Sequence, residues 1–294
     1  MSRLRRLLAD ADRALTAAGV SSPRVDAELL AAHVLDVPRG RLVLVDDLSD
    51  EQERSFEELV ARRCGREPVQ HLTGRAGFRG LELHVGPGVF TPRPETELLA
   101  GWAVEAARAA EVATGSDPVV VDLCTGSGAI AAAVAAEVPG AQVYAVELSP
   151  QAYSYAERNL AGTGVDLRLG DAATAFEDLD RSVDVVVSNP PYIPLSAYET
   201  VAEEARQHDP PLALWSGDDG LDVIRVVERT ASRLLREGGV VGCEHADAQG
   251  EVVPAVFARA NRWTAVCDHV DLTGRPRWTT ARLHDGPALA PWMP

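Results

Sequence analysis

The residues with the clearest chemical potential are Ser188-Asn189-Pro190-Pro191-Tyr192, which follow the apolar run 183–188. The run predicts a strand, so Asn189 stands where the chain leaves the sheet. Because two prolines follow, the backbone directions after Asn189 are restricted. Asn-Pro-Pro is also a good turn signal, so a purely structural turn is the alternative interpretation.

This corner suits the capture of a planar –NH2 group. The lone pair of an amide nitrogen is delocalised, and no side chain deprotonates it at neutral pH. The side-chain oxygen of Asn189 and the carbonyl of Pro190 can accept its two N–H donors. The nitrogen is then aimed at an electrophile, and the charge that develops on it is accommodated. Tyr192 can flank the planar group, and its ring face suits a nearby sulfonium cation. The scheme requires no general base.

A second candidate site lies upstream, in Asp122-Leu123-Cys124-Thr125-Gly126-Ser127-Gly128, between a predicted strand and a predicted helix. Small residues let the backbone approach a ligand, and the helix N-terminus favours an anion. A dinucleotide loop would need glycine where Cys124 stands, and no P-loop GK[ST] follows. The loop therefore predicts a cofactor with one adenosine and no pyrophosphate. A tight turn without a ligand is the alternative.

Two acids follow the next two predicted strands. Glu147 stands 21 positions after Gly126 (147 − 126), where an acid binds the ribose hydroxyls of an adenosine cofactor. Taken alone, Glu147 would be a solvated strand-end carboxylate, but the loop and the acid together favour the ribose role. Asp171 could accept from an adenine amino group or could cap the next segment, and both interpretations remain open.

The elements that position these residues alternate between strand and helix from about residue 94. This alternation predicts a parallel, doubly wound sheet. The last two strands are separated only by a loop around Gly274-Arg275-Pro276, so they must form an antiparallel hairpin. The predicted strands are 119–124, 142–147, 166–169, 183–188, 240–244, 263–270 and 277–283, and the predicted helices lie near 129–137, 150–161, 221–236 and 248–260.

The first 66 residues predict a small helical module. Apolar residues recur at helical spacing, and Pro23 opens a second helix. Ser49 with Gln52 predicts a capping box at the start of a third helix, which Gly65 ends. Nothing in this module suggests chemistry, so a docking or packing role is expected. Residues 67–93 predict a short hairpin connector turning at Arg79-Gly80, and Pro94 is expected to open the next helix.

Bulk properties exclude several classes of protein. The 294 residues carry a formal net charge of −16, which opposes direct binding of a phosphate backbone. There is no apolar run of 18 residues, so no membrane segment is expected. The four cysteines lack zinc-ligand spacing, so no metal is predicted. The charged N-terminus lacks a signal-peptide core, which predicts a cytoplasmic protein.

The motifs together resemble a known family. SNPPYI after a nucleotide loop is similar to methyltransferases that act on exocyclic nitrogens of DNA adenine, ribosomal guanine or protein glutamine. The segments EPVQHLTG (67–74) and FTPRPETE (90–97), with DLCTGSGAI, resemble the peptide chain release factor glutamine methyltransferases, the PrmC/HemK family. The resemblance covers the whole chain. It implies an α/β fold: a Rossmann-like class I S-adenosyl-L-methionine-dependent methyltransferase domain (94–294), an N-terminal helical substrate-docking domain (1–66) and a hairpin linker (67–93).

The resemblance also implies a substrate and a set of site residues. The substrate is the glutamine of the GGQ tripeptide in class-one release factors, and S-adenosyl-L-homocysteine is the second product. The implied cofactor contacts are Cys124, Thr125, Gly126, Ser127, Gly128, Glu147, Asp171, Ala172 and Asn189; the implied glutamine contacts are Asn189, Pro190, Pro191, Tyr192 and Phe90, of which Asn189, Pro190 and Tyr192 are catalytic.

Three departures from the family pattern stand out. Cys124 replaces a common glycine, and Ala172 stands where a larger residue often stacks near adenine. The segment 243–246 follows the usual apolar-Glu-His-Gly pattern only loosely, so Glu244 and His245 are expected to be strand-end structure. Arg93, Glu95 and Glu97 are expected to be structural, with Arg93 pairing with nearby carboxylates.

Two rival functions use the same residues. A nucleic-acid amino methyltransferase would carry a basic, aromatic-rich recognition region, whereas the N-terminal module has arginines but few aromatics. A non-catalytic cofactor-sensing or scaffold protein would carry a damaged site, whereas all residues from Asn189 to Tyr192 are present.

Overall fold

The computed structural model describes residues 2–201, 203–284 and 286 of the chain. These residues form two compact units. The first unit contains the chain up to Arg75, a short return at 85–87, and a later segment, 201–209. The second unit contains the remaining described residues. The chain thus leaves and re-enters the first unit twice after the N-terminal module ends.

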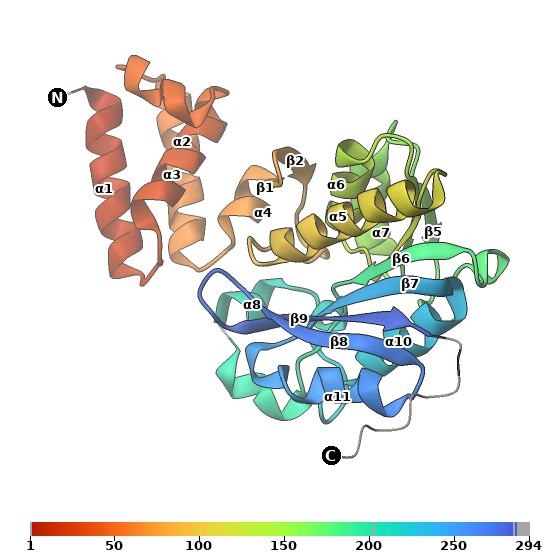
Figure 1. The fold of residues 1–294 in the computed structure, drawn as a ribbon. Helices are drawn as coiled ribbons and strands as arrows, with labels where there is room; N and C mark the ends of the chain where they lie inside the picture. The colour runs from red at the N-terminus through yellow and green to blue at the C-terminus, as the bar shows by residue number, and fades with distance from the viewer. Residues whose placement is uncertain (1, 202, 285, 287–294) are drawn as a thin grey trace. The chain divides into compact units, whose positions relative to one another are not determined.

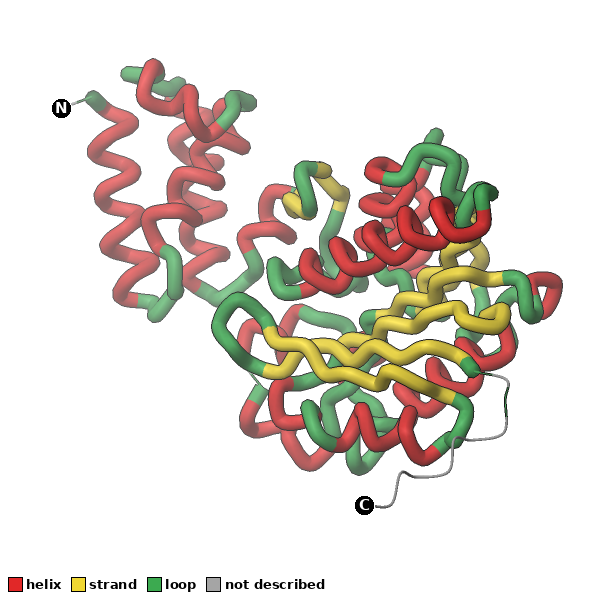
Figure 2. The backbone as a smooth tube through the Cα atoms, viewed as in Figure 1, coloured by secondary structure: helices red, strands yellow, loops and turns green. Residues whose placement is uncertain are grey.

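The first unit consists of helices and loops as far as Gly74 (Figure 2). The predicted capping box is confirmed: the Gln52 amide donates to Ser49 Oγ at 3.2 Å, and the Ser49 amide donates to Gln52 Oε1 at 2.9 Å. Leu4, Leu8 and Leu15 of the first helix are buried in this unit's own core, together with Leu30 of the second helix. The helices are α1 (Arg3–Ala17), α2 (Pro23–Leu35), the 3-10 helix η1 (Arg39–Leu44), α3 (Asp50–Cys64), α4 (Val69–Thr73) and α8 (Glu203–His208).

A buried arginine joins α8 to the other helices of the first unit. Arg63 donates to Asp26 at 2.7 Å and to Glu204 at 2.9 Å, and its side chain is only 5% exposed. The Glu67 carbonyl accepts a third bond from the same guanidinium at 2.9 Å. Because a buried charge without partners is costly, this arrangement holds Glu204 of the late segment against α2 and α3.

The second unit is built on a seven-stranded sheet with the order β5-β4-β3-β6-β7-β9-β8 (Figure 1). The first five strands in this order pair in parallel, and β9 is antiparallel to both of its neighbours. The predicted mixed sheet with an antiparallel last hairpin is therefore confirmed. The strands are β3 (Val119–Leu123), β4 (Gln142–Glu147), β5 (Asp166–Leu169), β6 (Val183–Ser188), β7 (Leu235–Glu244), β8 (Trp263–Val270) and β9 (Pro276–Leu283). The predicted hairpin is present as β1 (Arg75–Phe78) and β2 (Leu81–His84).

Helices cover both faces of the sheet (Figure 1). Successive residues of a strand point to opposite faces, so Val120 packs in the core beneath one helical layer and Val121 in the core beneath the other. One layer contains α5 (Thr96–Thr114), α6 (Ala129–Glu137) and α7 (Pro150–Leu160); the other contains α10 (Asp222–Leu234) and α11 (Val252–Arg259). The strand order reverses between β3 and β6, and ligands of such sheets bind beyond the carboxyl ends at this point.

Several predicted boundaries were wrong. The strand predicted at 240–244 begins earlier, at Leu235, because Leu235 already pairs with Val183 across an irregularity in the register of β6 and β7. This pairing also ends α10 before the predicted residue 236. The helix predicted at 248–260 is divided into η4 (Asp247–Gln249) and α11, and α5 begins at Thr96 rather than at Pro94. Six short elements were not predicted: η1, α4, which lies in the predicted hairpin linker, η2 (Glu177–Leu179), η3 (Leu195–Thr200), α8 and α9 (Pro211–Leu214).

Candidate active site

The loop after β3 has the strand–loop–helix geometry that the sequence predicted. Its backbone is left-handed at Cys124 (φ 60°), Gly126 (φ 59°) and Gly128 (φ 82°). A Cβ added at Gly126 would meet no atom within 4 Å, whereas one at Gly128 would meet Leu160 at 3.0 Å. Gly128 is therefore needed for packing against α7, and Gly126 presents bare backbone to open space where a ligand can approach. Cys124 adopts the left-handed conformation that glycine, the common family residue, adopts without strain.

Glu147, the last residue of β4, fastens this loop. Its Oε2 atom accepts from the Gly126 amide at 2.8 Å, and its Oε1 atom accepts from the Ser149 amide at 2.8 Å. Burial raises the pKa of Glu147 above its ordinary value, and these two backbone bonds act in the opposite direction. A carboxylate offers about four acceptor positions, so Glu147 can also accept from a ribose hydroxyl. The residues therefore fit an adenosine cofactor at this point.

Asp122 lies within β3 and also accepts hydrogen bonds from the loop and the helix that follows it. Its Oδ2 atom accepts from Thr125 Oγ1 at 2.6 Å and from the Ala131 amide at 3.2 Å. Burial raises the pKa of Asp122 to about 7. No role was predicted for Asp122; an acid inside the otherwise apolar strand 119–123 was the available signal.

Asp171 follows β5, and its carboxylate caps the next turn. Its Oδ1 atom accepts from the Ala173 amide at 2.8 Å, and the side chain is exposed. The capping interpretation is thus confirmed, and the second oxygen of Asp171 is left for other donors. Ala172 is buried, and its carbonyl accepts from Thr230 Oγ1 at 3.0 Å.

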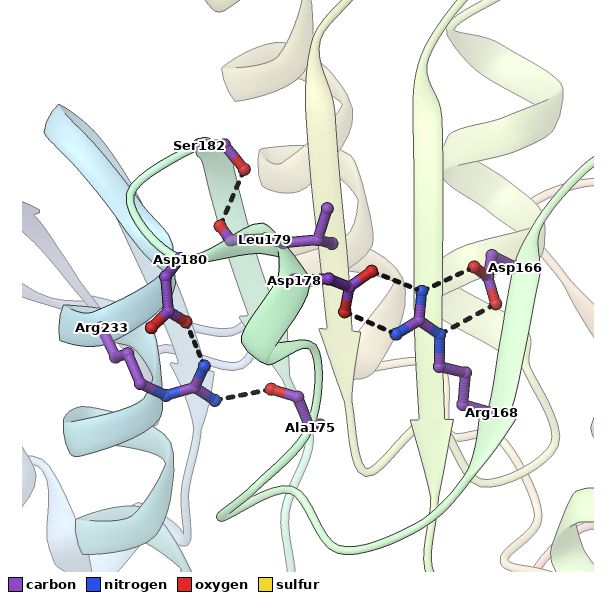
Figure 3. A network of polar contacts seen from close by, with 8 residues as sticks. All are labelled: Asp166, Arg168, Ala175, Asp178, Leu179, Asp180, Ser182 and Arg233. Carbon is purple, nitrogen blue, oxygen red and sulfur yellow. Dashed lines mark hydrogen bonds and ion pairs between the residues drawn. The ribbon is translucent and has the colours of Figure 1, made fainter.

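A polar network holds the segment that runs from Asp171 toward β6 (Figure 3). Arg168 of β5 bonds Asp166 and Asp178 on either side of its guanidinium, and the same guanidinium lies over the Phe176 ring at 4.7 Å. Arg233 of α10 bonds Asp180 and donates to the Ala175 carbonyl at 2.5 Å. The network joins both ends of the turn that carries η2 to β5 and α10.

Asn189 stands at the end of β6, next to the nucleotide loop. Ser188 pairs with Leu123 in the sheet register, and the Ser188 hydroxyl donates to the Leu123 carbonyl at 2.7 Å. The Asn189 Nδ2 atom donates to Thr96 Oγ1 at 3.2 Å. Within the described part of the chain, neither the Oδ1 atom of Asn189 nor the carbonyl of Pro190 accepts a hydrogen bond. Two oxygen acceptors are thus left at the corner where the sequence predicted them.

Tyr192 is held by both its side chain and its backbone. Its hydroxyl donates to Glu244 Oε1 at 3.4 Å, and its carbonyl accepts from Gln249 Nε2 at 3.0 Å. Burial raises the pKa of the Tyr192 phenol well above its usual value. A Cβ at Gly220 would lie 2.4 Å from the same carbonyl, so this position has room only for glycine. The next residue, Ile193, pairs with Trp215 in a single parallel bridge.

The FTPRPETE segment contributes residues on the approach to α5. The Arg93 guanidinium lies 5.0 Å from the centroid of the half-buried Phe90 ring. Glu97 Oε1 accepts from the Arg79 amide at 3.2 Å, which ties α5 to the hairpin turn. The structural role expected for Glu97 is thus confirmed. Glu244 ends β7 and His245 follows it, fully buried, with its ring bonded to Asp268 at 2.9 Å, in agreement with their expected strand-end roles.

Sequence reasoning missed Thr96 and Gln249 as residues that contact the Asn189–Tyr192 corner. Thr96 was visible only as a member of the FTPRPETE segment, and the local pattern around Gln249 carried no signal. In the described residues, no cluster of three or more His, Cys, Asp or Glu side chains is arranged to hold a metal ion. None of the described helices is both long and apolar enough to cross a membrane.

Comparisons with known proteins agree with this fold. Residues 107–208 match the methyltransferase small domain, which places the chain among the methyltransferases. Residues 6–74 match the PrmC N-terminal domain. The chain is 59% identical over 275 residues to the release factor glutamine methyltransferase of Streptomyces coelicolor, covering 94% of this chain and 96% of the relative. It is 50% identical over 283 residues to that of Mycolicibacterium smegmatis, covering 96% and 98%. The chain belongs to the release factor glutamine methyltransferase family.

A relative named for another activity shows a similar level of identity. The chain is 44% identical over 263 residues to the 4-amino-L-phenylalanine/4-methylamino-L-phenylalanine methyltransferase of Streptomyces pristinaespiralis, covering 89% of each chain. That relative acts on an amine attached to an aromatic ring, which is also a flat nitrogen with a delocalised lone pair.

Proposed function

We propose that this chain transfers a methyl group from S-adenosyl-L-methionine to the side-chain amide nitrogen of the glutamine in the GGQ motif of class-one release factors, and so modulates translation termination. The observation that carries the proposal is the pair of oxygen acceptors, Asn189 Oδ1 and the Pro190 carbonyl, that no described residue uses. They lie at the end of β6, beside the loop after β3.

The chain's own residues orient the acceptor nitrogen. The cofactor, when bound, supplies a methyl group attached to a positively charged sulfur. Asn189 Oδ1 and the Pro190 carbonyl each accept one N–H of the glutamine amide, so that its plane is fixed and its nitrogen is aimed. Such orientation can lower a barrier by roughly 7–11 kcal/mol. As the carbon–nitrogen bond forms and the carbon–sulfur bond breaks, these oxygens stabilise the charge on nitrogen, whose proton then leaves to water.

The remaining site residues bind the two reactants. Glu147 binds the ribose hydroxyls, and the loop from Cys124 through Thr125, Gly126, Ser127 and Gly128 lies against the rest of the nucleoside and the amino-acid part. Asp171 and Ala172 would contact the adenine, and Asn189 would contact both cofactor and substrate. Pro191, Tyr192 and Phe90 wall the pocket for the glutamine side chain. The second product is S-adenosyl-L-homocysteine.

The partner is a protein rather than a nucleic acid or a membrane. The net charge of −16 repels a phosphate backbone. The helical N-terminal domain, 1–66, docks the release factor, the hairpin linker spans 67–93, and the catalytic domain spans 94–294. The reaction belongs to the cytoplasm, where release factors act on ribosomes.

A second candidate function is methylation of a small aromatic amine. The 44% identity to the 4-amino-L-phenylalanine enzyme favours it, because the same two acceptors could hold an arylamine –NH2. The two functions differ in the size of the acceptor molecule and in the need for a docking surface.

Mass spectrometry of a purified class-one release factor after incubation with this protein and S-adenosyl-L-methionine tests the proposal. We expect one added methyl group on the GGQ glutamine, and none on a release factor in which that glutamine is alanine. Parallel reactions contain 4-amino-L-phenylalanine, duplex DNA or ribosomal RNA. Methylation of one of these acceptors without methylation of the release factor would refute the proposed substrate.

Asn189→Ala tests the mechanism in the same assay. It removes one of the two acceptors, so turnover should be almost lost while cofactor affinity stays close to that of the unchanged protein. Gln142→Ala is the matched control: it removes an exposed side-chain amide at the first residue of β4, the end of the strand away from Glu147. Full turnover by Asn189→Ala would contradict the mechanism.

A further inference from the structure

Thr96 is a buried hydroxyl that contacts the catalytic asparagine. It is the first residue of α5 and is 4% exposed. Its Oγ1 atom accepts from Asn189 Nδ2 at 3.2 Å, which is within the ordinary range for such a bond. The proposed reaction uses the Oδ1 atom of this amide, so the bond at Nδ2 affects whether Oδ1 faces the substrate.

The orientation of an asparagine amide decides what it can bind. One end of the amide accepts and the other donates, and a half-turn exchanges them. An –NH2 group needs an acceptor, so the reaction requires Oδ1 toward the substrate and Nδ2 away from it. A hydroxyl can donate or accept, so Thr96 by itself would satisfy either orientation. A third group must therefore set the direction of the Thr96 hydroxyl.

Glu244 is that third group. Glu244 is the last residue of β7, and Asn189 directly follows β6. The residues just before them in the chain, Cys243 and Ser188, are register partners in the sheet. The Thr96 hydroxyl lowers the pKa of the Glu244 carboxyl, and Tyr192 donates to Glu244 Oε1 at 3.4 Å. The Oε2 atom of Glu244 is buried and accepts no hydrogen bond from the described residues, so it is available to the Thr96 proton.

The charge of Glu244 favours the same direction. Burial raises the pKa of Glu244 to about 7, and Glu95 also raises it, whereas Thr96, Arg277 of β9 and the Tyr192 hydroxyl lower it. The ionised form, which prevails above this pH, accepts and cannot donate, so the Thr96 proton then turns toward Glu244 and the Thr96 oxygen is left to accept from Asn189. The contacts then have one polarity, from Asn189 through Thr96 to Glu244.

We infer that Thr96, directed by Glu244, is a positioning residue that keeps the Asn189 side-chain oxygen facing the substrate –NH2 group. The inference rests on the proposed function and adds to it the residues that set its geometry. It also gives Thr96, the second threonine of the FTPRPETE segment, a role that the segment's structural residues do not have.

The test compares Thr96→Val, which keeps the shape and removes the hydroxyl, with Thr96→Ser, which keeps the hydroxyl. Loss of the directing bond should lower kcat of Thr96→Val by about tenfold, the equivalent of about one hydrogen bond. Cofactor affinity and Tm should stay near those of the unchanged protein, and Thr96→Ser should recover most of kcat. A Thr96→Ser variant as slow as Thr96→Val, or a Thr96→Val variant with full kcat, would overturn the inference.

A double variant separates positioning from general structure. If Thr96 acts through Asn189, Thr96→Val should cause no further loss in the residual rate of an Asn189→Ala background, since the oriented group is gone. The same tenfold loss in both backgrounds would overturn the inference. Glu244→Gln is a second isosteric variant, whose amide can donate as well as accept; its kcat should fall between those of Thr96→Val and the unchanged protein, and full kcat would also count against the inference.

Reactions with the two acceptors distinguish a failure of the inference about Thr96 from a failure of the proposed function. Transfer to the release factor with no difference between Thr96→Val and Thr96→Ser would refute the inference alone. Transfer only to 4-amino-L-phenylalanine would refute the proposed substrate, and the ratio between the variants would then be measured with that amine. No transfer to either acceptor would refute both.

Discussion

The most direct probe of the cofactor site is Glu147→Gln, which replaces one oxygen of a buried carboxylate by an –NH2 group. In the structure the two carboxylate oxygens each accept one backbone amide, from Gly126 and from Ser149, at 2.8 Å. Glutamine keeps one acceptor oxygen and replaces the other with a donor. One of these backbone amides then faces an –NH2 group, and one ribose hydroxyl loses its acceptor.

The magnitude follows from the bond that the ribose loses. Hydrogen bonds to charged groups contribute about 1.5–3 kcal/mol, so cofactor affinity should fall about 10- to 150-fold. Stability should change less, because burial raises the pKa of Glu147 and the uncharged amide removes the cost of a buried charge. At saturating cofactor kcat should stay close to that of the unchanged protein, because Glu147 does not contact the acceptor amide in the proposed mechanism.

Isothermal titration calorimetry with S-adenosyl-L-homocysteine measures the loss. Glu105→Gln is the matched control: it makes the same chemical change on a side chain that is 71% exposed on α5. A dissociation constant of Glu147→Gln within about twofold of the control would refute the ribose role, because the calculation requires at least about a tenfold change.

Three further outcomes are expected. Burial raises the pKa of Glu244 to about 7 from an ordinary 4.5, so the folded protein holds a proton there that the unfolded chain has lost, and stability falls as pH rises through this range. Glu244→Gln should therefore gain Tm relative to the unchanged protein between about pH 5 and about pH 8, and parallel Tm curves would contradict this assignment. Gln249→Ala leaves the Tyr192 carbonyl without its bond and should cost about 1–3 kcal/mol in urea unfolding; an unchanged midpoint would show that the bond does not stabilise the fold. In the folded protein, Cys267 is exposed and should be alkylated first, whereas burial raises the pKa of Cys124 to about 12 and should make it slow to react; peptide mapping gives the order.

Much of the fold followed from short-range signals. The capping box at Ser49 and Gln52 and the hairpin turn at Arg79 were predicted from neighbouring residues, and the structure contains both. The seven strands followed from apolar runs, and the antiparallel hairpin followed from the short loop between the last two of them. Each of these features depends on residues a few positions apart, so the pattern was visible along the chain.

Boundaries were predicted less well where pairing partners decide them. The predicted strand began at residue 240, after Gly238 and Gly239. In the structure β7 already begins at Leu235, opposite Val183 of β6. The segment 201–209 likewise contained no sign that it belongs with the N-terminal helices. It joins them through Glu204 and Arg63, which are 141 positions apart.

The candidate site around Asn189 was likewise predicted only in part from the sequence. The order of residues along the chain was enough to place Asn189 and Pro190 at a strand end, and Glu147 at the end of another, because a strand end and its motif are local features. Which end of the Asn189 amide faces outward, what holds the Tyr192 carbonyl, and which oxygens remain without a donor were decided only by the folded chain. These properties depend on hydrogen bonds between residues distant in sequence, such as Asn189 with Thr96 and Tyr192 with Gln249, and such bonds exist only once the sheet has brought their elements together.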